Sequence, residues 1–284
     1  MVISVMLTSF VIIVSIFTYR NYKREDEGGL IIKLIGYYLL GAFRFNFNTT
    51  AIPLGFIIYL LFFWPYRNRH LKRRMAVLGF AIFIVGLLIP KFQEAYFERQ
   101  RYVAASSSNI YKMDLERDIQ AINSKLGISQ DARLEDFNAD FDESGEIRDL
   151  RYMLITAEDN GFTLYNISYS SEKRRYSIGA SRVQQWLQYG MLIGEEQFTR
   201  MLKRLDFEKC KPEGSFAYYT IQYNGSYGSW AVKDCENFMV QDDGLKKVDN
   251  SALPVSGHIF LTYGMEKTGE SSYSGGKKRA YIFP

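Results

Sequence analysis

Four apolar stretches fill the first third of the chain, and each is apolar on all sides instead of striped. They cover residues 2–19, 30–43, 51–66 and 75–90. A membrane-spanning helix needs about 20 residues, with a range of roughly 17–25, whereas a surface helix of a soluble bundle shows one apolar stripe. The first stretch meets this length directly, and the others reach it with flanking residues. The second is the least secure because Lys33 lies inside it. The pattern predicts four transmembrane helices, at about 2–19, 30–47, 48–66 and 75–90.

Basic residues between these stretches predict the topology. They gather in two segments, residues 19–25 and 65–74, and short loops rich in Lys and Arg stay in the cytoplasm. The second segment carries the stronger signal: Arg67, Arg69, Lys72, Arg73 and Arg74. Four spans place both segments inside and the C-terminal half outside. We therefore expect a multi-pass protein of the cell membrane whose C-terminal domain lies outside the cytoplasm.

The pattern changes after residue 104. Residues 111–126 repeat apolar positions at steps of three and four, which predicts a helix, and residues 195–207 predict a second one. Alternation of apolar and polar residues predicts strands at 151–159, 162–171 and 174–181, and again between 215 and 263. The expected fold is a membrane region at 1–103, including a stalk, followed by an extracytoplasmic α+β domain at 104–284. Helices would cover one face of an antiparallel sheet, and the order of elements suggests halves at about 110–190 and 191–284.

Charge supports this division and excludes one class of partner. Residues 1–104 carry 13 Lys and Arg against 5 Asp and Glu, whereas residues 105–284 carry 22 against 26. The formal net charge of +4 therefore comes from residues beside apolar segments, where it indicates topology. We expect no nucleic-acid partner.

One segment begins like a calcium-binding loop. In DFDESGEIRDLR the candidate ligands are Asp140, Asp142 and Ser144, followed by Gly145. An EF-hand loop closes with a bidentate Glu at its twelfth position, which is Arg151 here. Because a cation cannot supply that ligand, we predict a turn between two strands instead of a metal site.

The sequence signals for a catalytic or transport site are weak. The two histidines, His70 and His258, have no partner at a metal-ligating spacing. The tail sequence GGKK, at 275–278, lacks the upstream Gly and the following Ser or Thr of a phosphate-binding loop. None of the four predicted spans contains Asp or Glu, which ion-coupled transport normally needs. We therefore expect no catalytic residue, no cofactor and no transporter.

The two cysteines, Cys210 and Cys235, both lie in the half expected outside. An oxidising location predicts a disulfide between them, and the alternative is two unrelated buried thiols.

These observations predict a membrane-anchored, extracytoplasmic module without catalytic activity, which binds, senses, or helps to assemble or regulate a partner. Its expected partners are the lipid bilayer and another membrane or envelope protein. The alternative is an envelope enzyme or a transporter-accessory subunit whose active residues the sequence does not reveal.

Overall fold

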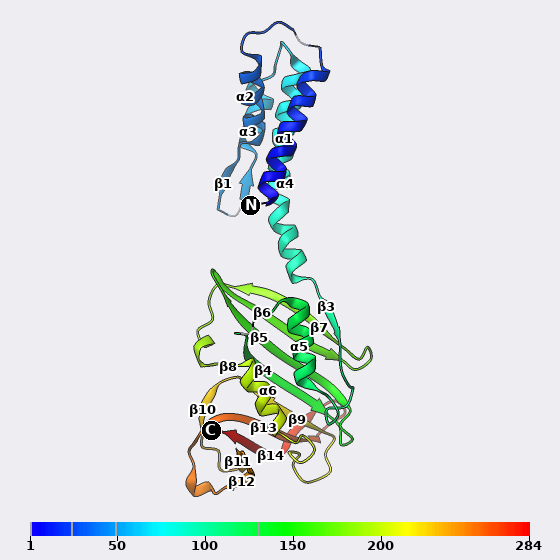
Figure 1. Ribbon diagram of the computed structural model, residues 1–284, viewed down its shortest axis with the longest axis vertical. Helices are drawn as coiled ribbons and strands as arrows, with labels where there is room; N and C mark the ends of the chain where they lie inside the picture. The colour runs from blue at the N-terminus through cyan, green and yellow to red at the C-terminus, as the bar shows by residue number, and fades with distance from the viewer. Residues whose placement is uncertain (1, 24, 49, 130) are drawn as a thin grey trace. The chain divides into compact units, whose positions relative to one another are not determined.

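The computed structural model describes residues 2–23, 25–48, 50–129 and 131–284. The chain forms two compact units, Met1–Tyr96 and Phe97–Pro284, shown in Figure 1. We call them the N-terminal and C-terminal units and describe each by itself.

The N-terminal unit consists of helices and one short hairpin. Its elements are α1 (Val2–Asn21), α2 (Leu30–Ala42), β1 (Phe45–Phe47), β2 (Thr50–Ile52), α3 (Leu54–Phe62) and α4 (Arg69–Glu98), the last of which runs past the end of the unit. Glycines let these helices pack closely. A Cβ at Gly41 would lie 2.0 Å from the carbonyl oxygen of Ala76, and one at Gly79 would lie 2.1 Å from that of Tyr38. The contact of α2 with α4 therefore depends on residues without side chains.

The prediction of four membrane spans is wrong. Among the described residues, α4 is the one helix that is long and apolar enough to cross a membrane. Helix α2 has 13 residues and α3 has 9. At 1.5 Å per residue these are roughly 20 and 14 Å long, against about 30 Å for the hydrocarbon core. The chain leaves α2 at Phe43, whose backbone is extended, and forms the β1–β2 hairpin before Pro53. The apolar residues assigned to two spans thus divide between two short helices and a hairpin, so a multi-pass membrane protein is not supported.

The C-terminal unit is built on one sheet of twelve strands. The strands are β3 (Arg101–Ala104), β4 (Arg133–Phe141), β5 (Ile147–Glu158), β6 (Gly161–Ser170), β7 (Arg175–Val183), β8 (Ile193–Gly194), β9 (Tyr218–Tyr223), β10 (Tyr227–Trp230), β11 (Glu236–Gln241), β12 (Gly244–Val248), β13 (Val255–Lys267) and β14 (Tyr273–Phe283). Their order is β12-β11-β14-β13-β9-β4-β5-β6-β7-β3, with β10 on β13 and β8 on β4. Short 3-10 helices occur at Tyr189–Met191 and Asn250–Ala252.

This topology corrects two details of the expected fold. The sheet is mixed, because β11 pairs with β14 in parallel while the other ladders are antiparallel. The two expected halves also share that single sheet, since β4 of the first pairs with β9 of the second along Phe137–Phe141.

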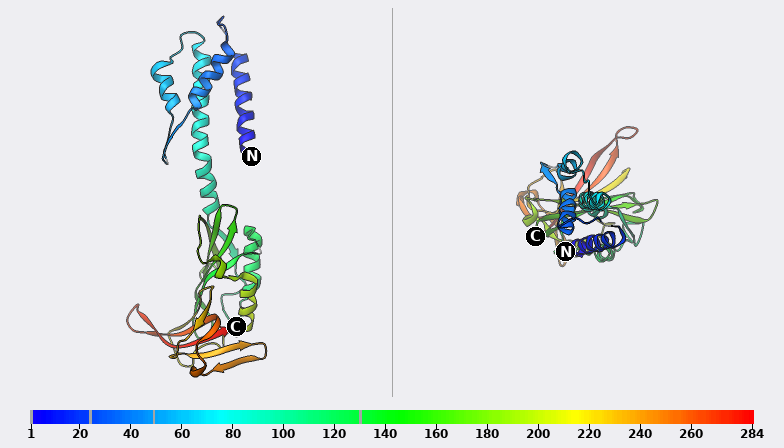
Figure 2. Two further views of the ribbon diagram at one scale, coloured as in Figure 1. Left: turned by 90° about the vertical axis from the view of Figure 1, so that its left-hand side faces the viewer. Right: turned by 90° about the horizontal axis from the view of Figure 1, so that it is seen from above.

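Two helices cover the same face of the sheet, as Figure 2 shows. Helix α5 (Leu115–Leu126) starts at Asp114, whose side chain accepts a hydrogen bond from the Arg117 N–H, and ends at Gly127 in the left-handed conformation. Helix α6 (Glu195–Arg204) buries Phe198, Met201 and Leu202 against the strands. We call this covered side the inner face.

The inner face holds the main core of the C-terminal unit. The ring of Phe198 stacks on Tyr223 at 5.9 Å and on Phe260 at 6.1 Å between centroids, and it also contacts Phe137. Since successive strand residues point to opposite faces, the residues between these rings point to the other side of the sheet, which we call the outer face. Part of the outer face is covered by the segment 184–192, which packs on Ile155 and Leu164. Another part of the outer face has a cavity.

Candidate functional site

One polar cavity of the C-terminal unit lies on the outer face of its sheet. We call it the polar groove; its volume is about 400 Å³, within the range of small-ligand sites. It lies where the ladder between β4 and β9 stops, at the pair Phe137 and Tyr223. The residues that line it are Asp136, Asn138, Arg151, Gln222, Tyr223, Asn224, Ser226, Gly228, Ser229, Trp230, Ile259 and Leu261.

Two irregularities in the backbone open the groove. The register of β4 shifts between Leu134 and Asp136, and the turn Asn224–Ser226 interrupts the chain between β9 and β10, which both pair with β13. Gly225 has a φ of +73°, and a Cβ there would lie 2.1 Å from the carbonyl oxygen of Leu134. The turn is held where it is by the N–H of Ile193, which donates to the Gly225 carbonyl at 2.8 Å. Bulges of this kind often lie next to functional sites.

Side chains on neighbouring strands form a chain of hydrogen bonds in the groove. Nε2 of Gln222 on β9 donates to Oδ1 of Asn138 on β4 at 3.1 Å, and Nδ2 of Asn138 donates to Oδ1 of Asp140 at 3.2 Å. Burial raises the pKa of Asp140, although hydrogen bonds from Thr220 and Asn138 oppose that shift. The amides are therefore oriented by their partners, and each retains hydrogen-bonding capacity for a ligand.

The lining also carries one charge of each sign. Asp136 is exposed at the rim, where partial desolvation raises its pKa and the charge of Arg151 opposes this. The guanidinium of Arg151 lies 3.7 Å from the carboxylate of Asp149 and is 62% exposed. Such an exposed pair is weak, so Arg151 remains available to a ligand.

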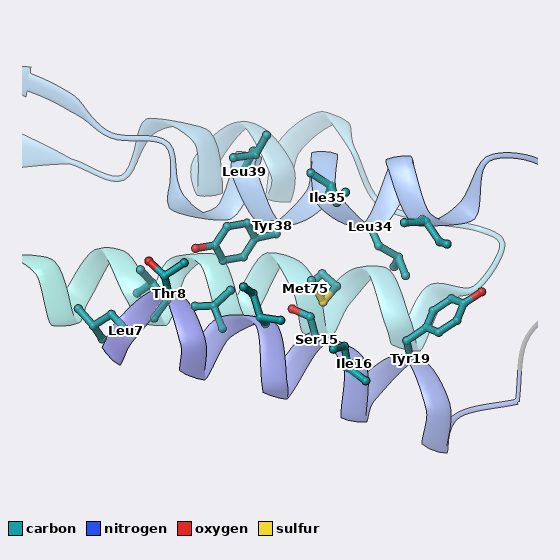
Figure 3. Close-up of a pocket in the computed structure, with 14 residues that line it drawn as sticks. Leu7, Thr8, Ser15, Ile16, Tyr19, Leu34, Ile35, Tyr38, Leu39 and Met75 are labelled. Atoms are coloured by element: carbon teal, nitrogen blue, oxygen red, sulfur yellow. The ribbon is translucent and has the colours of Figure 1, made fainter. Parts of the chain in front are cut away.

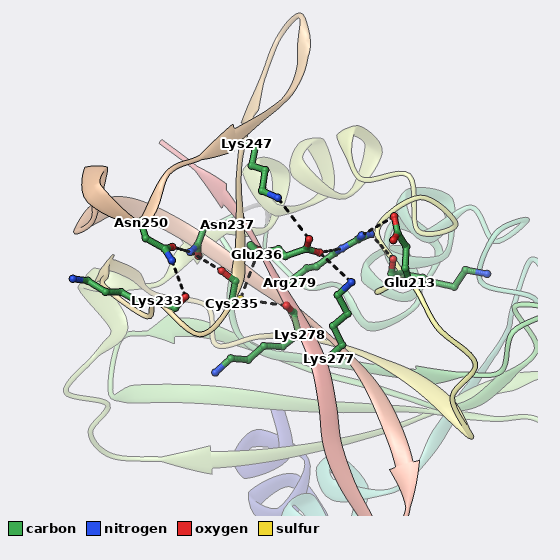
Figure 4. A network of polar contacts seen from close by, with 11 residues as sticks. Glu213, Lys233, Cys235, Glu236, Asn237, Lys247, Asn250, Lys277, Lys278 and Arg279 are labelled. Carbon is green, nitrogen blue, oxygen red and sulfur yellow. Dashed lines mark hydrogen bonds and ion pairs between the residues drawn. The ribbon is translucent and has the colours of Figure 1, made fainter.

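An aromatic ring closes the lining on the β10 side. Nε1 of Trp230 donates to Oδ1 of Asn237 at 2.6 Å. Asn237 is 1% exposed, and its own amide donates to the carbonyl oxygens of Val232 and Cys235 at 3.2 and 3.0 Å. Figure 4 shows the side chain of Asn237 beside Cys235. The indole is thus held through its N–H by a group that does not line the groove.

His258 lies on the inner face, behind the groove. Its Nδ1 is 2.8 Å from the hydroxyl of Tyr223, and the ring packs edge-on against Tyr227. Burial lowers the pKa of His258, and a hydrogen bond with the backbone of Ser226 opposes this shift. The imidazole therefore supports the turn from below instead of facing the groove.

The structure places the three weak metal candidates at the end of a hairpin. Asp142 accepts hydrogen bonds from the hydroxyl of Ser144 at 2.6 Å and from the N–H of Glu146 at 3.0 Å, which lower its pKa against its partial burial. Asp140 instead belongs to the hydrogen-bond chain of the groove. Strands β4 and β5 pair on either side, so the segment forms the predicted turn. In the described part of the chain, three or more His, Cys, Asp or Glu residues nowhere gather as metal ligands would.

Cys210 and Cys235 are free thiols in the structure. Cys210 lies against the inner face, where its carbonyl accepts hydrogen bonds from Thr262 and Tyr281. Cys235 lies beside the Lys278 carbonyl and lines a cavity with Tyr263. The side chain of Tyr263 points to the outer face, because that of its neighbour Thr262 points to the inner one. Burial raises the pKa of the thiols to about 12 and about 11 respectively. The sheet thus separates the two cysteines, and the structure does not contain the possible disulfide.

The GGKK tail lies in strand β14 and borders a charged cluster, also drawn in Figure 4. Nε of Arg279 donates to Glu236 at 2.7 Å and its NH1 donates to the Lys211 carbonyl at 2.6 Å. The first bond joins β14 to the parallel strand β11 and lowers the pKa of Glu236. The cluster therefore holds the sheet edge together.

In the N-terminal unit, the basic residues predicted as a loop lie largely on helix α4. Lys72 is buried in an ion pair with Glu27 at 2.6 Å, beside Lys33. Hydrogen bonds from Asn68, Lys33 and Lys72 lower the pKa of Glu27 to about 2. Arg69 and Arg73 lie over the ring of Trp64, and Arg74 lies over that of Tyr22. Lys72 is thus a packing residue, and the other four basic residues remain near the surface.

An apolar crevice of about 600 Å³ lies between α1, α2 and α4 of this unit, as Figure 3 shows. Hydroxyls from residues such as Thr8, Ser15 and Tyr38 interrupt an otherwise aliphatic lining that includes no charged side chain. It offers little to orient a polar ligand.

Sequence reasoning did not find the polar groove, although part of its signal is visible. In the run 136–141, polar Asp136, Asn138 and Asp140 alternate with apolar residues, which predicts a polar face on that strand. The partner strand that brings Gln222 beside Asn138 lies 84 residues away, so no local pattern could show the pair.

Comparison with known proteins gives a family and no further relative. No curated protein and no solved structure matches the chain. A family model described as "Archaeal family" matches residues 120–281, which run from within α5 to within β14 and include every residue of the groove. Because this match covers more than half of the 284 residues, the chain belongs to this archaeal family.

Proposed function

We propose that the chain is a membrane-anchored binding protein whose C-terminal unit takes a ligand in the polar groove. The observation that carries this proposal is the pre-ordered lining: side chains from β4, β5, β9 and β10 converge on one cavity, and Asn138 and Trp230 are already fixed by hydrogen bonds. Pre-ordered side chains reduce the entropy lost on binding.

The groove chemistry favours binding over catalysis. A serine nucleophile would need a base within hydrogen-bond reach, and Ser226 and Ser229 are the groove's serines. His258, the one histidine of the C-terminal unit, has its Nδ1 on the Tyr223 hydroxyl and meets Ser226 at its backbone. The hydroxyl of Ser226 instead donates to Asn224 at 3.1 Å. The carboxylate and the amides of the lining are suited to hydrogen bonding with a ligand.

Helix α4 supplies the proposed anchor. It is long and apolar enough to cross a membrane once, and Arg67, Arg69, Arg73 and Arg74 lie at or just before its N-terminal end. Positive residues beside a span favour the cytoplasmic side, which puts the C-terminal unit outside the cytoplasm.

Photo-crosslinking in native membranes tests the binding function. A photoreactive amino acid replaces Ser229, which lines the groove and is exposed, or Ser171, an exposed serine in the turn between β6 and β7. We expect a reproducible adduct from position 229 that is absent from position 171 and weaker when Gln222→Ala is added. No adduct from position 229, or the same adducts from both positions, would contradict the proposal.

A further inference from the structure

We infer that the polar groove binds a neutral saccharide, with a sugar ring against Trp230 and its hydroxyls on the side chains of β4, β5 and β9. This inference rests on the proposed function and names the ligand class for the same groove. Three features of the groove carry it: its planar hydrogen-bonding groups, its fixed aromatic ring and its charge balance.

The hydrogen-bonding groups match sugar hydroxyls. The lining presents the amides of Asn138, Gln222 and Asn224, the carboxylate of Asp136 and the guanidinium of Arg151. All are planar groups that offer two donors, two acceptors or one of each in a fixed geometry. Adjacent hydroxyls of a sugar ring form a matching pair, because each hydroxyl both donates and accepts. A ligand with few hydroxyls would leave several of these groups unpaired, which costs binding free energy.

Trp230 provides the apolar complement. A sugar ring has an edge of hydroxyls and a face of C–H groups, and such a face packs on an aromatic ring. The indole N–H of Trp230 is already used by Asn237 at 2.6 Å, outside the lining. The ring therefore reaches the groove with its carbon surface and without a polar atom to satisfy. Because Asn237 is buried and bonded to two backbone carbonyls, the ring position is fixed before a ligand arrives.

The charge balance selects an uncharged ligand. The lining holds one carboxylate, Asp136, and one guanidinium, Arg151. An anionic ligand that pairs with Arg151 would bring its negative charge near Asp136. A cationic ligand that pairs with Asp136 would bring its positive charge near Arg151. A neutral ligand can accept from one group and donate to the other with charge-assisted hydrogen bonds, which are the stronger kind.

The test uses the full chain in lipid nanodiscs and measures saturation-transfer NMR and tryptophan fluorescence with soluble neutral oligosaccharides of glucose, mannose, galactose and N-acetylglucosamine. We expect saturation transfer to the C–H protons of at least one of them and a change in the emission of Trp230. Trp186 gives the matched control, because it lies outside the groove and its N–H donates to Glu135. Trp186→Phe should keep both signals, and Trp230→Phe should keep the NMR signal while losing the fluorescence change.

Substitutions separate stacking from hydrogen bonding. Trp230→Ala should weaken the affinity at least tenfold, whereas Trp230→Phe, which keeps a ring, should bind within a few fold of the parent chain. Gln222→Ala should weaken binding by about three- to tenfold, the usual value of one hydrogen bond. Melting temperatures of all variants show whether the fold is intact. Equal affinity for Trp230→Ala with an intact fold would overturn the inference.

A second measurement identifies the source of the sugar. Native membranes treated with periodate, which cleaves vicinal diols, are compared with untreated membranes in the photo-crosslinking experiment. Loss of the adduct at position 229 after treatment indicates a saccharide, because periodate cleaves the vicinal diols of free and membrane-bound sugars alike. Washing untreated membranes before crosslinking then separates the two sources: an adduct that washing removes indicates a free saccharide, and an adduct that survives washing indicates a membrane-bound glycan. A periodate-resistant adduct with a polypeptide, without any oligosaccharide signal, would overturn the saccharide inference and leave the proposed binding function standing.

Discussion

The two faces of the sheet in the C-terminal unit are formed by the same strands but differ in their side chains: the inner face is apolar and packed, and the outer face is polar. On β4 and β9 the inner residues Phe137 and Tyr223 are 1% and 2% exposed and pack with Phe198. The residues next to them, Asn138 and Gln222, hydrogen-bond to each other on the outer face. Burial of the apolar inner residues stabilises the folded chain. The polar outer residues can form hydrogen bonds with water as well as with one another, so their hydrogen bonds add little to the free energy of folding. Substitutions on the inner face should therefore affect folding, and those on the outer face should affect binding.

The largest effect is expected at the centre of the inner face. Phe198→Ala removes a fully buried ring that contacts three other aromatic side chains, so the free energy of unfolding should fall by about 3–5 kcal/mol. Denaturant titration of the full chain in detergent measures this. The control is Leu187→Ala, since Leu187 is 97% exposed and should change stability by less than about 0.5 kcal/mol. Equal effects of both substitutions would remove the distinction between the core and the surface.

A smaller effect is expected where the two faces meet, at the turn between β9 and β10. Gly225→Ala forces a Cβ against the Leu134 carbonyl oxygen in a backbone conformation unfavourable to L residues, so it should cost about 1–3 kcal/mol and also weaken ligand binding. Gly179→Ala is the matched control, because a Cβ there meets no atom within 4 Å and the residue lies in β7, outside the lining of the groove. If both alanine variants melt at the temperature of the parent chain, the turn does not constrain the groove.

A pH effect should come from His258, which supports the same turn. Burial lowers the pKa of this imidazole, so the unfolded chain binds its proton more readily than the folded one. The stability that the neutral ring contributes is complete above its unfolded pKa of about 6.5 and is lost as the pH falls through the lower folded pKa. Melting curves between pH 7.5 and pH 5 should show this decline, and His258→Gln should reduce it. An identical decline of the melting temperature in the variant would show that other titratable groups cause it.

The smallest effect on stability is expected on the outer face. Gln222→Ala and Arg151→Ala alter exposed side chains and should each change the free energy of unfolding by no more than about 0.5 kcal/mol. Both should still weaken ligand binding, which the NMR titration measures. A loss of stability as large as that of Phe198→Ala would show that the outer face belongs to the core.

Local patterns predicted both helices of the C-terminal unit, but the predicted start at residue 111 lies four residues before α5 and the predicted end at residue 207 lies three residues beyond α6. The apolar positions of α5 and α6, the Asp114 cap and the stop at Gly127 are all set by residues within a few positions of one another. The turn at 142–145 is likewise set by local residues, because Asp142 bonds to Ser144 and Glu146. The same local reasoning failed in the N-terminal unit, where composition alone suggested long spans and the chain instead breaks at Phe43 and Pro53.

The sequence by itself determined which residues alternate between the faces of a strand and which two segments of the C-terminal unit form its helices, because these features depend on neighbours along the chain. Only the tertiary structure decided that the strands form a single mixed sheet, that Gln222 lies beside Asn138, and that the turn at Gly225 opens a groove beside Trp230. The reason is physical: strand pairing is set by the burial of side chains that are distant in sequence, and several pairings satisfy the same local alternation of apolar and polar residues.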